Sequence, residues 1–179
     1  MSSNLVRAAR HLLAVLVVLV AVCFAAVAQG ADTNVITGTV EKVDSGAKTI
    51  AVKTADGTVE TVKFTEKTSV HGLKDAAKGA DLAGKEGGHV IVHTVGEGSE
   101  KTAHSVEWVG DKTVHTTEGT VEDVGKGSKT VAVKTADGTK ETFDVADHAV
   151  VSGAKKGEHV TVYYTEEAGK KIAHVFKHL

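Results

Sequence analysis

Residues 38–62, GTVEKVDSGAKTIAVKTADGTVETV, recur at 119–143 as GTVEDVGKGSKTVAVKTADGTKETF, with 18 identities in 25 positions. In both stretches valine and isoleucine alternate with threonine, lysine and glutamate. A period of two is typical of strands that bury one face. An Asp-Gly pair, at 56–57 and 137–138, separates the last two strands of each stretch. It predicts a type I′ hairpin, because both central residues of that turn need a positive φ.

The repeat continues beyond this stretch. Residues 86–106 match 156–176 at 8 of 21 positions, including His89 with His159 and His104 with His174. The offset between the copies falls from 81 to 70, so the first copy carries eleven extra residues within 73–85. The chain is therefore a tandem duplication.

Each copy of the repeat predicts five short strands. In the first copy they lie near 35–43, 48–54, 58–64, 88–95 and 101–109, and in the second near 116–124, 129–135, 139–145, 158–165 and 170–177. The alanine-rich residues 73–79 predict a short helix between the third and fourth strands of the first copy. Five strands with a helix at that place are typical of an OB fold, and closing such a small sheet into a barrel hides its edges. The fold class is therefore all-β, as two tandem five-stranded OB-like small β-barrels at 33–110 and 115–179, with SH3-like barrels as the alternative.

The first 28 residues have the pattern of a secretory signal peptide. Arg7 and Arg10 precede an apolar run, Leu12–Ala28, that ends in Ala-Val-Ala. We expect cleavage after Ala28 and export to the periplasm or the extracellular space. An uncleaved membrane anchor is the alternative. Cleavage changes the formal charge from −2 to −4 and removes the single cysteine, so the exported protein would have no disulfide.

Four short motifs carry a resemblance to known domains. They are Gly-Thr-Val-Glu-x-Val at 38–43, Lys-Thr-Ile-Ala-Val-Lys at 48–53, Gly-x-His-Val-x-Val at 87–92 and Ala-His at 103–104. This pattern resembles tandem short secreted bacterial β-barrel domains of unknown function. It is distantly similar to the periplasmic copper/silver-binding efflux chaperone family, which implies an OB-like barrel. That family binds its metal through a histidine and two methionines capped by a tryptophan. Here the mature chain has no methionine, and the strand that would hold the histidine reads Val52-Lys53-Thr54, so the soft-ligand Cu(I) site does not carry over.

Histidines are the main candidate site residues, and nine remain after cleavage. Pairing the last two strands of the first copy across Gly96–Ser99 puts Ile91 opposite His104, with His89 and His93 as diagonal neighbours on one face. Diagonal neighbours about 7–8 Å apart could converge on Zn, Ni or Cu(II). In the second copy the equivalents His159 and His174 predict a weaker site. The alternative is that these histidines are solvated strand residues or line a contact between the barrels. Val106, Trp108 and Phe176 fall on the same predicted face, which favours the contact.

Other function classes have little support in the sequence. The negative charge of the mature chain and the presence of only seven aromatic residues in the whole chain disfavour nucleic-acid binding. Trp108, Tyr163 and Tyr164 could form a glycan or peptide platform, or belong to the barrel cores or to a contact between the barrels. The motifs of serine hydrolases and of zinc proteases are missing from the sequence, and we expect no enzyme. The expected function is an exported, non-enzymatic binding or structural module of the cell envelope, with a protein or small-molecule partner and no membrane contact after cleavage. The alternative is a periplasmic divalent-metal-binding protein that uses the strand histidines.

Overall fold

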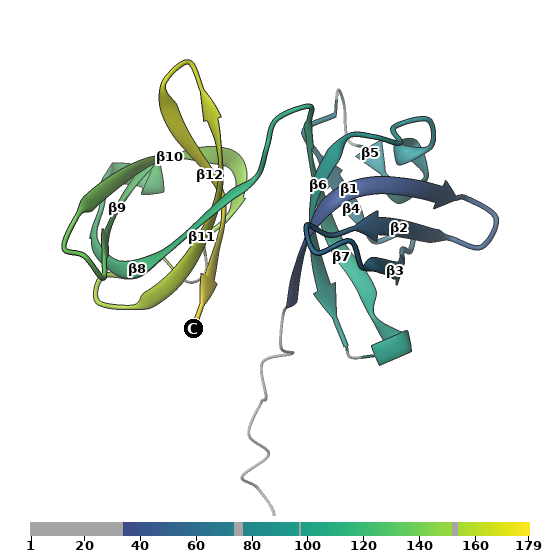
Figure 1. Ribbon diagram of the computed structural model, residues 1–179, viewed down its shortest axis with the longest axis horizontal. Helices are drawn as coiled ribbons and strands as arrows, with labels where there is room; N and C mark the ends of the chain where they lie inside the picture. Colours follow the sequence, from purple (N-terminus) through teal and green to yellow (C-terminus); the bar gives the residue numbers. More distant parts are fainter. Residues whose placement is uncertain (1–33, 74–76, 97, 152–153) are drawn as a thin grey trace, which may run out of the picture. The chain divides into compact units, whose positions relative to one another are not determined.

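The computed structural model describes residues 34–73, 77–96, 98–151 and 154–179, which form two small β-barrels (Figure 1). The predicted signal peptide lies outside the described residues. Asp32–Leu179 forms one unit, which contains both barrels. Within the described ranges, no helix has the length and apolar character needed to span a bilayer.

Five strands form the first barrel. They are β1 (Asn34–Asp44), β2 (Thr49–Lys53), β3 (Val59–Lys63), β6 (His89–Val95) and β7 (Thr102–Gly110). Their order is β3-β2-β1-β6-β7, and a parallel contact between Lys63 and Thr102 joins β7 back to β3. With β6 and β7 as fourth and fifth strands, this ring order is that of an OB fold.

The helix predicted over 73–79 falls partly on residues 74–76, which lie outside the described residues, and the described helical turn of this insertion begins only at Gly79. Ala77–Lys78 is a short strand, β5, which pairs with β4 (Ser69–His71), and a 3₁₀ helix, η2, follows at Gly79–Leu82. Leu82 is fully buried, and a Cβ on Gly79 would lie 2.5 Å from the Phe64 ring. Gly79 and Leu82 therefore pack closely on the core of the first barrel.

The second barrel also has five strands. They are β8 (His115–Val124), β9 (Thr130–Thr135), β10 (Lys140–Val150), β11 (His159–Glu167) and β12 (Lys170–His178). They close completely in the order β10-β12-β11-β8-β9. Asp144 on β10 pairs with Ile172 on β12. This is the equivalent of the Lys63–Thr102 pair that closes the first barrel, because Asp144 follows Lys63 by 81 residues and Ile172 follows Thr102 by 70. Two further 3₁₀ turns, η3 (Gly98–Glu100) and η4 (Lys126–Ser128), lie in hairpin loops.

Each barrel has its own apolar core, built from the inward positions of its strands. Val90, Val92 and Ala103 are buried in the first core, as the alternation predicts. The first core comprises Ile36, Val40, Ile50, Val52, Val62, Phe64, Val70, Leu82, Val90, Val92, Ala103 and Val106. The second comprises Val121, Val131, Val133, Phe143, Ala154, Val160, Val162, Tyr164, Ala173 and Phe176.

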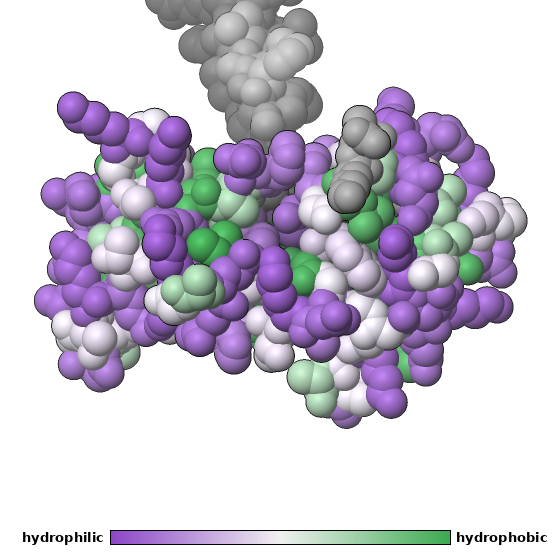
Figure 2. All heavy atoms as spheres, turned by 90° about the horizontal axis from the view of Figure 1, so that it is seen from above, coloured by the Kyte–Doolittle hydropathy of each residue, from purple (hydrophilic) through white to green (hydrophobic). Residues whose placement is uncertain are grey.

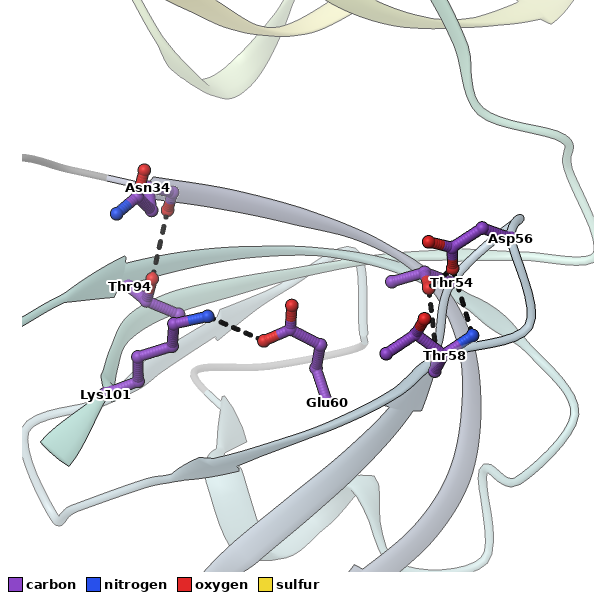
Figure 3. Close-up of polar contacts among 7 residues, drawn as sticks. All are labelled: Asn34, Thr54, Asp56, Thr58, Glu60, Thr94 and Lys101. Atoms are coloured by element: carbon purple, nitrogen blue, oxygen red, sulfur yellow. Dashed lines mark hydrogen bonds and ion pairs between the residues drawn. The ribbon is translucent and has the colours of Figure 1, made fainter. Parts of the chain in front are cut away.

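The Asp-Gly hairpins are present, but the predicted type I′ turn is wrong. Gly57 has a φ of +86°, whereas Asp56 is not among the described non-glycine residues with positive φ. The Gly57 N–H donates to Thr54 O at 2.9 Å, so the turn closes one residue earlier and ends in a left-handed glycine. The Asp56 carboxylate accepts from the Thr58 N–H at 3.0 Å and from the Thr54 hydroxyl (Figure 3). These bonds lower the pKa of Asp56, the Thr54 hydroxyl most strongly.

An ion pair lies near the closing seam of each barrel, at equivalent positions in the two repeats. Lys101 Nζ is 2.7 Å from Glu60 Oε2 (Figure 3), and Lys171 Nζ is 2.6 Å from Glu141 Oε1. Lys171 also lies 5.1 Å from the ring centroid of Tyr164. The hydrogen bond to Glu141 raises the pKa of Lys171. Both copies thus place an opposite-charge pair between the strands that close the barrel.

Candidate functional site: a histidine face and a polar cleft

A β-bulge sets the position of His104. On β6 and β7, His93 pairs with Ser105 and Thr94 with Ala103, so His104 is the extra residue. Ile91 pairs with Glu107, and the predicted pairing of Ile91 with His104 is wrong by three residues. Two of the three arise because the hairpin loop is longer than predicted and includes η3. The bulge adds the third.

The second barrel has the same bulge at the equivalent place. Tyr163 pairs with Val175 and Tyr164 with Ala173, which leaves His174 as the extra residue. A bulge moves the following residues to the other face of the strand. Val106 and Phe176 are therefore in the cores, and not on the histidine face as predicted.

A third apolar cluster joins the outer faces of the two equivalent strand pairs, β6–β7 and β11–β12. Its buried members are Ile91 and Val109 from the first barrel and Val175 from the second. The partly buried residues Val35, Val114 and Tyr163 complete it. Tyr163 thus belongs to this cluster, Tyr164 is in the second core and Trp108 packs against the first core. These positions agree with the interpretation of the three aromatic residues as core or contact residues.

His93 lies on this outer face with only 3% of its surface exposed. The pKa of His93 is lowered to about 4, mainly by burial. Glu107 acts in the opposite direction, and His104 and His71 contribute to the lowering. A neutral imidazole in this place carries no desolvation penalty for charge. His93 is therefore neutral at pH 7 and contributes to the contact as a polar, uncharged ring.

His174 is the second buried histidine, at 8% exposure. Its Nε2 lies 2.9 Å from the Thr165 hydroxyl, and its Nδ1 lies 3.4 Å from Glu107 Oε1. Nδ1 is buried and makes no hydrogen bond, so it lies close to Glu107 without a hydrogen bond to it. Glu107 thus faces His174 from β7 and also influences His93.

Sequence reasoning missed two histidines that meet here. The His71 and His148 rings stack with centroids 4.5 Å apart and planes inclined by 15°. His71 lies on β4, where it pairs in parallel with Glu107. In the sequence, the apolar residue Val70 beside His71 is the only sign of the strand β4. The partner strand is more than thirty residues away in the sequence.

The five predicted ligands do not share one site. His93 and His174 are on the covered face, and His104 is exposed. His89 lines a separate cleft, and His159 contacts the Thr120 hydroxyl at 3.3 Å. Among the described residues, no three histidine, cysteine or acidic side chains are arranged to hold a metal ion. Metal binding by these histidines stays a prediction.

The cleft beside His89 has a volume of about 320 Å³ and opens at one end of the first barrel. Strands β1 and β2, the hairpin that follows β2, the start of β6 and the segment before β8 contribute its walls. It is lined by Thr37, Gly38, Thr39, Lys53, Thr54, Ala55, Gly57, His89, Thr113 and Val114. A Cβ on Gly38 would collide with the Lys53 carbonyl, so glycine lets β1 approach β2 closely at the floor of the cleft.

A second pocket, of about 510 Å³, lies on the second barrel. Its wall contains two ion pairs, Lys170–Asp144 at 3.1 Å and Lys171–Glu141 at 2.6 Å. These charges compensate each other within the protein. The face of the molecule seen in Figure 2 is mostly hydrophilic, with apolar side chains in small areas.

The ring order, the two cores and the closed second sheet define a tandem pair of OB-like β-barrels. No family model and no curated protein matches the chain. Among solved structures, apo-CusF from Escherichia coli is 16% identical, with 38% of this chain and 89% of CusF covered and a TM-score of 0.34. Ag(I)CusF is 17% identical, with 42% and 96% covered and a TM-score of 0.32. The Drosophila Unr CSD456 fragment covers 83% of this chain at 16% identity, with a TM-score of 0.31. Likenesses at this level carry no argument about function.

Proposed function

We propose that this chain is an exported, non-enzymatic binding module of the cell envelope, and that the cleft of the first barrel is its ligand site. The histidine face, in this proposal, holds the two barrels together. The observation that carries the proposal is the cleft, whose lining consists of side chains that neither core uses. Its volume is at the lower end of the range for small-ligand pockets.

Amide NMR of the mature chain, residues 29–179, tests the binding. We expect at least one member of a panel of small anionic, neutral and cationic compounds to shift the amides of Gly38, Thr39 and His89. The equivalent amides of the second barrel, Gly119, Thr120 and His159, serve as an internal control. A panel that leaves the cleft amides unmoved, or moves both sets equally, contradicts a ligand site in the first barrel.

Export is tested separately from binding. The full chain is expressed in a bacterium, and the product is recovered by fractionation and its N-terminus sequenced. The proposal expects a product that starts at Gln29 outside the cytoplasm. A product that keeps residues 1–28 in the cytoplasmic fraction would contradict export.

A second candidate function is the binding of a divalent metal. It is favoured by the neutral imidazole of His93 and by the proximity of His71, His104 and Glu107, each of which affects the pKa of His93. Neutral imidazoles are ligands for Zn, Ni and Cu(II). Native mass spectrometry with micromolar amounts of each metal tests the candidate. Retention of an ion that is lost in His104→Ala but kept in His178→Ala supports it, and no retention contradicts it.

A further inference from the structure

Lys53 is the one residue with a permanent charge among the described lining residues of the first cleft. Lys53 and His89 line it, and none of its lining residues is an aspartate or a glutamate. The remaining members offer threonine hydroxyls, glycine backbone and the small apolar side chains of Ala55 and Val114. The cleft thus combines one permanent positive charge with hydrogen-bond donors and a small apolar wall.

Lys53 has no carboxylate partner. In the part of the chain that the structure describes, no acidic oxygen lies within 4.0 Å of its ammonium group, although nine other lysines form ion pairs. The nearby Asp56 carboxylate is engaged by Thr54 and Thr58. The contrast with the pocket of the second barrel is clear, because its Lys170 and Lys171 are both paired. Of the two described pockets, the first is therefore the one lined by a lysine that makes no described ion pair.

Two further polar groups of the cleft make no hydrogen bond within the described part of the protein. His89 Nδ1 is buried and has no hydrogen-bond partner, and among the described contacts the Thr39 hydroxyl makes none. Their counterparts in the second barrel, His159 and Thr120, contact each other at 3.3 Å. The first barrel thus leaves two polar groups of the cleft uncommitted, whereas the equivalent groups of the second barrel contact each other.

From these observations we infer that the cleft binds a small organic anion, a carboxylate or a phosphate monoester. Lys53 supplies the opposite charge, and the Thr39 and His89 side chains supply hydrogen bonds. Charge-assisted hydrogen bonds to carboxylate or phosphate oxygens are the strong class of such contacts. The small volume of the cleft and its apolar wall at Val114 favour an anion with a short carbon skeleton. This inference rests on the proposed function, because it names the ligand class of the same site.

The second repeat provides a matched control. Gly38, Thr39, Lys53, Thr54, Ala55, Gly57 and His89 recur as Gly119, Thr120, Lys134, Thr135, Ala136, Gly138 and His159. Thr113 and Val114, which wall the first cleft, precede β8, and the pocket described on the second barrel is lined by a different set of residues that does not include Lys134. Lys53→Gln and Lys134→Gln make the same change on exposed strand ends, and of the two lysines only Lys53 lines one of the two described pockets.

The experiment is an NMR titration of the mature chain and both variants with succinate, glycerol 3-phosphate and, as the neutral probe, glycerol. We expect succinate or glycerol 3-phosphate to shift the Gly38 and Thr39 amides, and glycerol to leave them in place. Lys53→Gln should weaken binding about tenfold or more, and Lys134→Gln less than about twofold, since a charged hydrogen bond is lost in only one of them.

The outcomes separate this inference from the proposed function. Equal affinity in the wild type and Lys53→Gln, or binding of glycerol alone, would overturn the anion assignment and leave a binding cleft. If none of these probes moves the cleft amides, the anion assignment fails, and the wider panel then decides on the cleft itself. A response to succinate alone or to glycerol 3-phosphate alone identifies which class of anion fits.

Discussion

Lowering the pH from 7 to 4 should destabilise the protein through His93. The pKa of this buried histidine falls from 6.5 to about 4, mainly because burial disfavours its charged form. In the unfolded chain the same ring takes up a proton near pH 6.5. Stability is therefore complete above about pH 6.5, declines as the pH falls and reaches its full loss below about pH 4. Each unit of pKa difference is worth about 1.4 kcal/mol, so the loss from His93 amounts to about 3 kcal/mol.

Urea unfolding at several pH values between 7 and 4 measures this loss. The fluorescence of Trp108, the only tryptophan, reports on the first barrel. His93→Gln keeps a polar side chain of similar size that cannot take up a proton, so its free energy of unfolding should fall by about 3 kcal/mol less than that of the wild type over this range. The ionisable neighbours Glu107, His104, His71 and, from the second barrel, His174 are present in both proteins.

His104→Gln is the control, because it also replaces a histidine by glutamine but at an exposed position. Its pH profile should follow that of the wild type. The reasoning would be refuted by parallel profiles for the wild type and His93→Gln. It would equally be refuted if His104→Gln flattened the profile as much as His93→Gln did.

Three further predictions concern stability. Gly88→Ala places a Cβ in collision with the Trp108 ring, and should cost about 1–3 kcal/mol in urea unfolding and change the near-UV circular dichroism. Lys171→Met and Glu141→Gln, alone and combined, should give a coupling energy of about 1 kcal/mol in a double-mutant cycle, because the pair is only 29% and 21% exposed. Asp137→Ala removes the acceptor of the Thr139 N–H at 2.9 Å, and should lower the urea midpoint of the second barrel.

Each of these predictions has a control on the exposed surface. Gly46→Ala meets only an Asp44 oxygen at 3.5 Å and should change stability by less than about 0.5 kcal/mol. The exposed pair Lys48–Glu66, at 2.9 Å, should show no measurable coupling. Asp111→Ala should leave the urea midpoint unchanged. A control that behaves like its partner variant would contradict the contact named for that variant.

The sequence predicted the strands and cores well because these depend on local alternation. Val90 and Val92 are inward in the structure as their period of two requires. The register of β6 against β7 could not be predicted, because it depends on the loop that contains η3 and on the bulge at His104. Neither feature leaves a pattern in the sequence. A one-residue error exchanges the two faces of a strand, which is why Val106 was assigned to the histidine face.

The candidate site was predicted only in part, for a related reason. His93 and His174 were singled out, but their burial follows from packing between segments far apart in the chain. His71 and His148 meet through β4 and β10, and the three-residue strand β4 pairs in parallel with β7. Parallel pairing needs a long connection and has no short-range signal in the sequence. The cleft beside Lys53 likewise needs Thr113, which lies between the two predicted barrels at 33–110 and 115–179.

The position of β12 in the second barrel has a consequence for how the chain acquires its structure. This strand lies between β10 and β11 and forms two of the five seams of the closed sheet. A ribosome or a translocation channel releases β8, β9, β10 and β11 before it. Until Lys170–His178 has emerged, those four strands form at most an open ribbon whose apolar face and strand edges are unprotected. The first barrel has all its strands much earlier, so the chain should emerge with one barrel closed and the other waiting for its last strand.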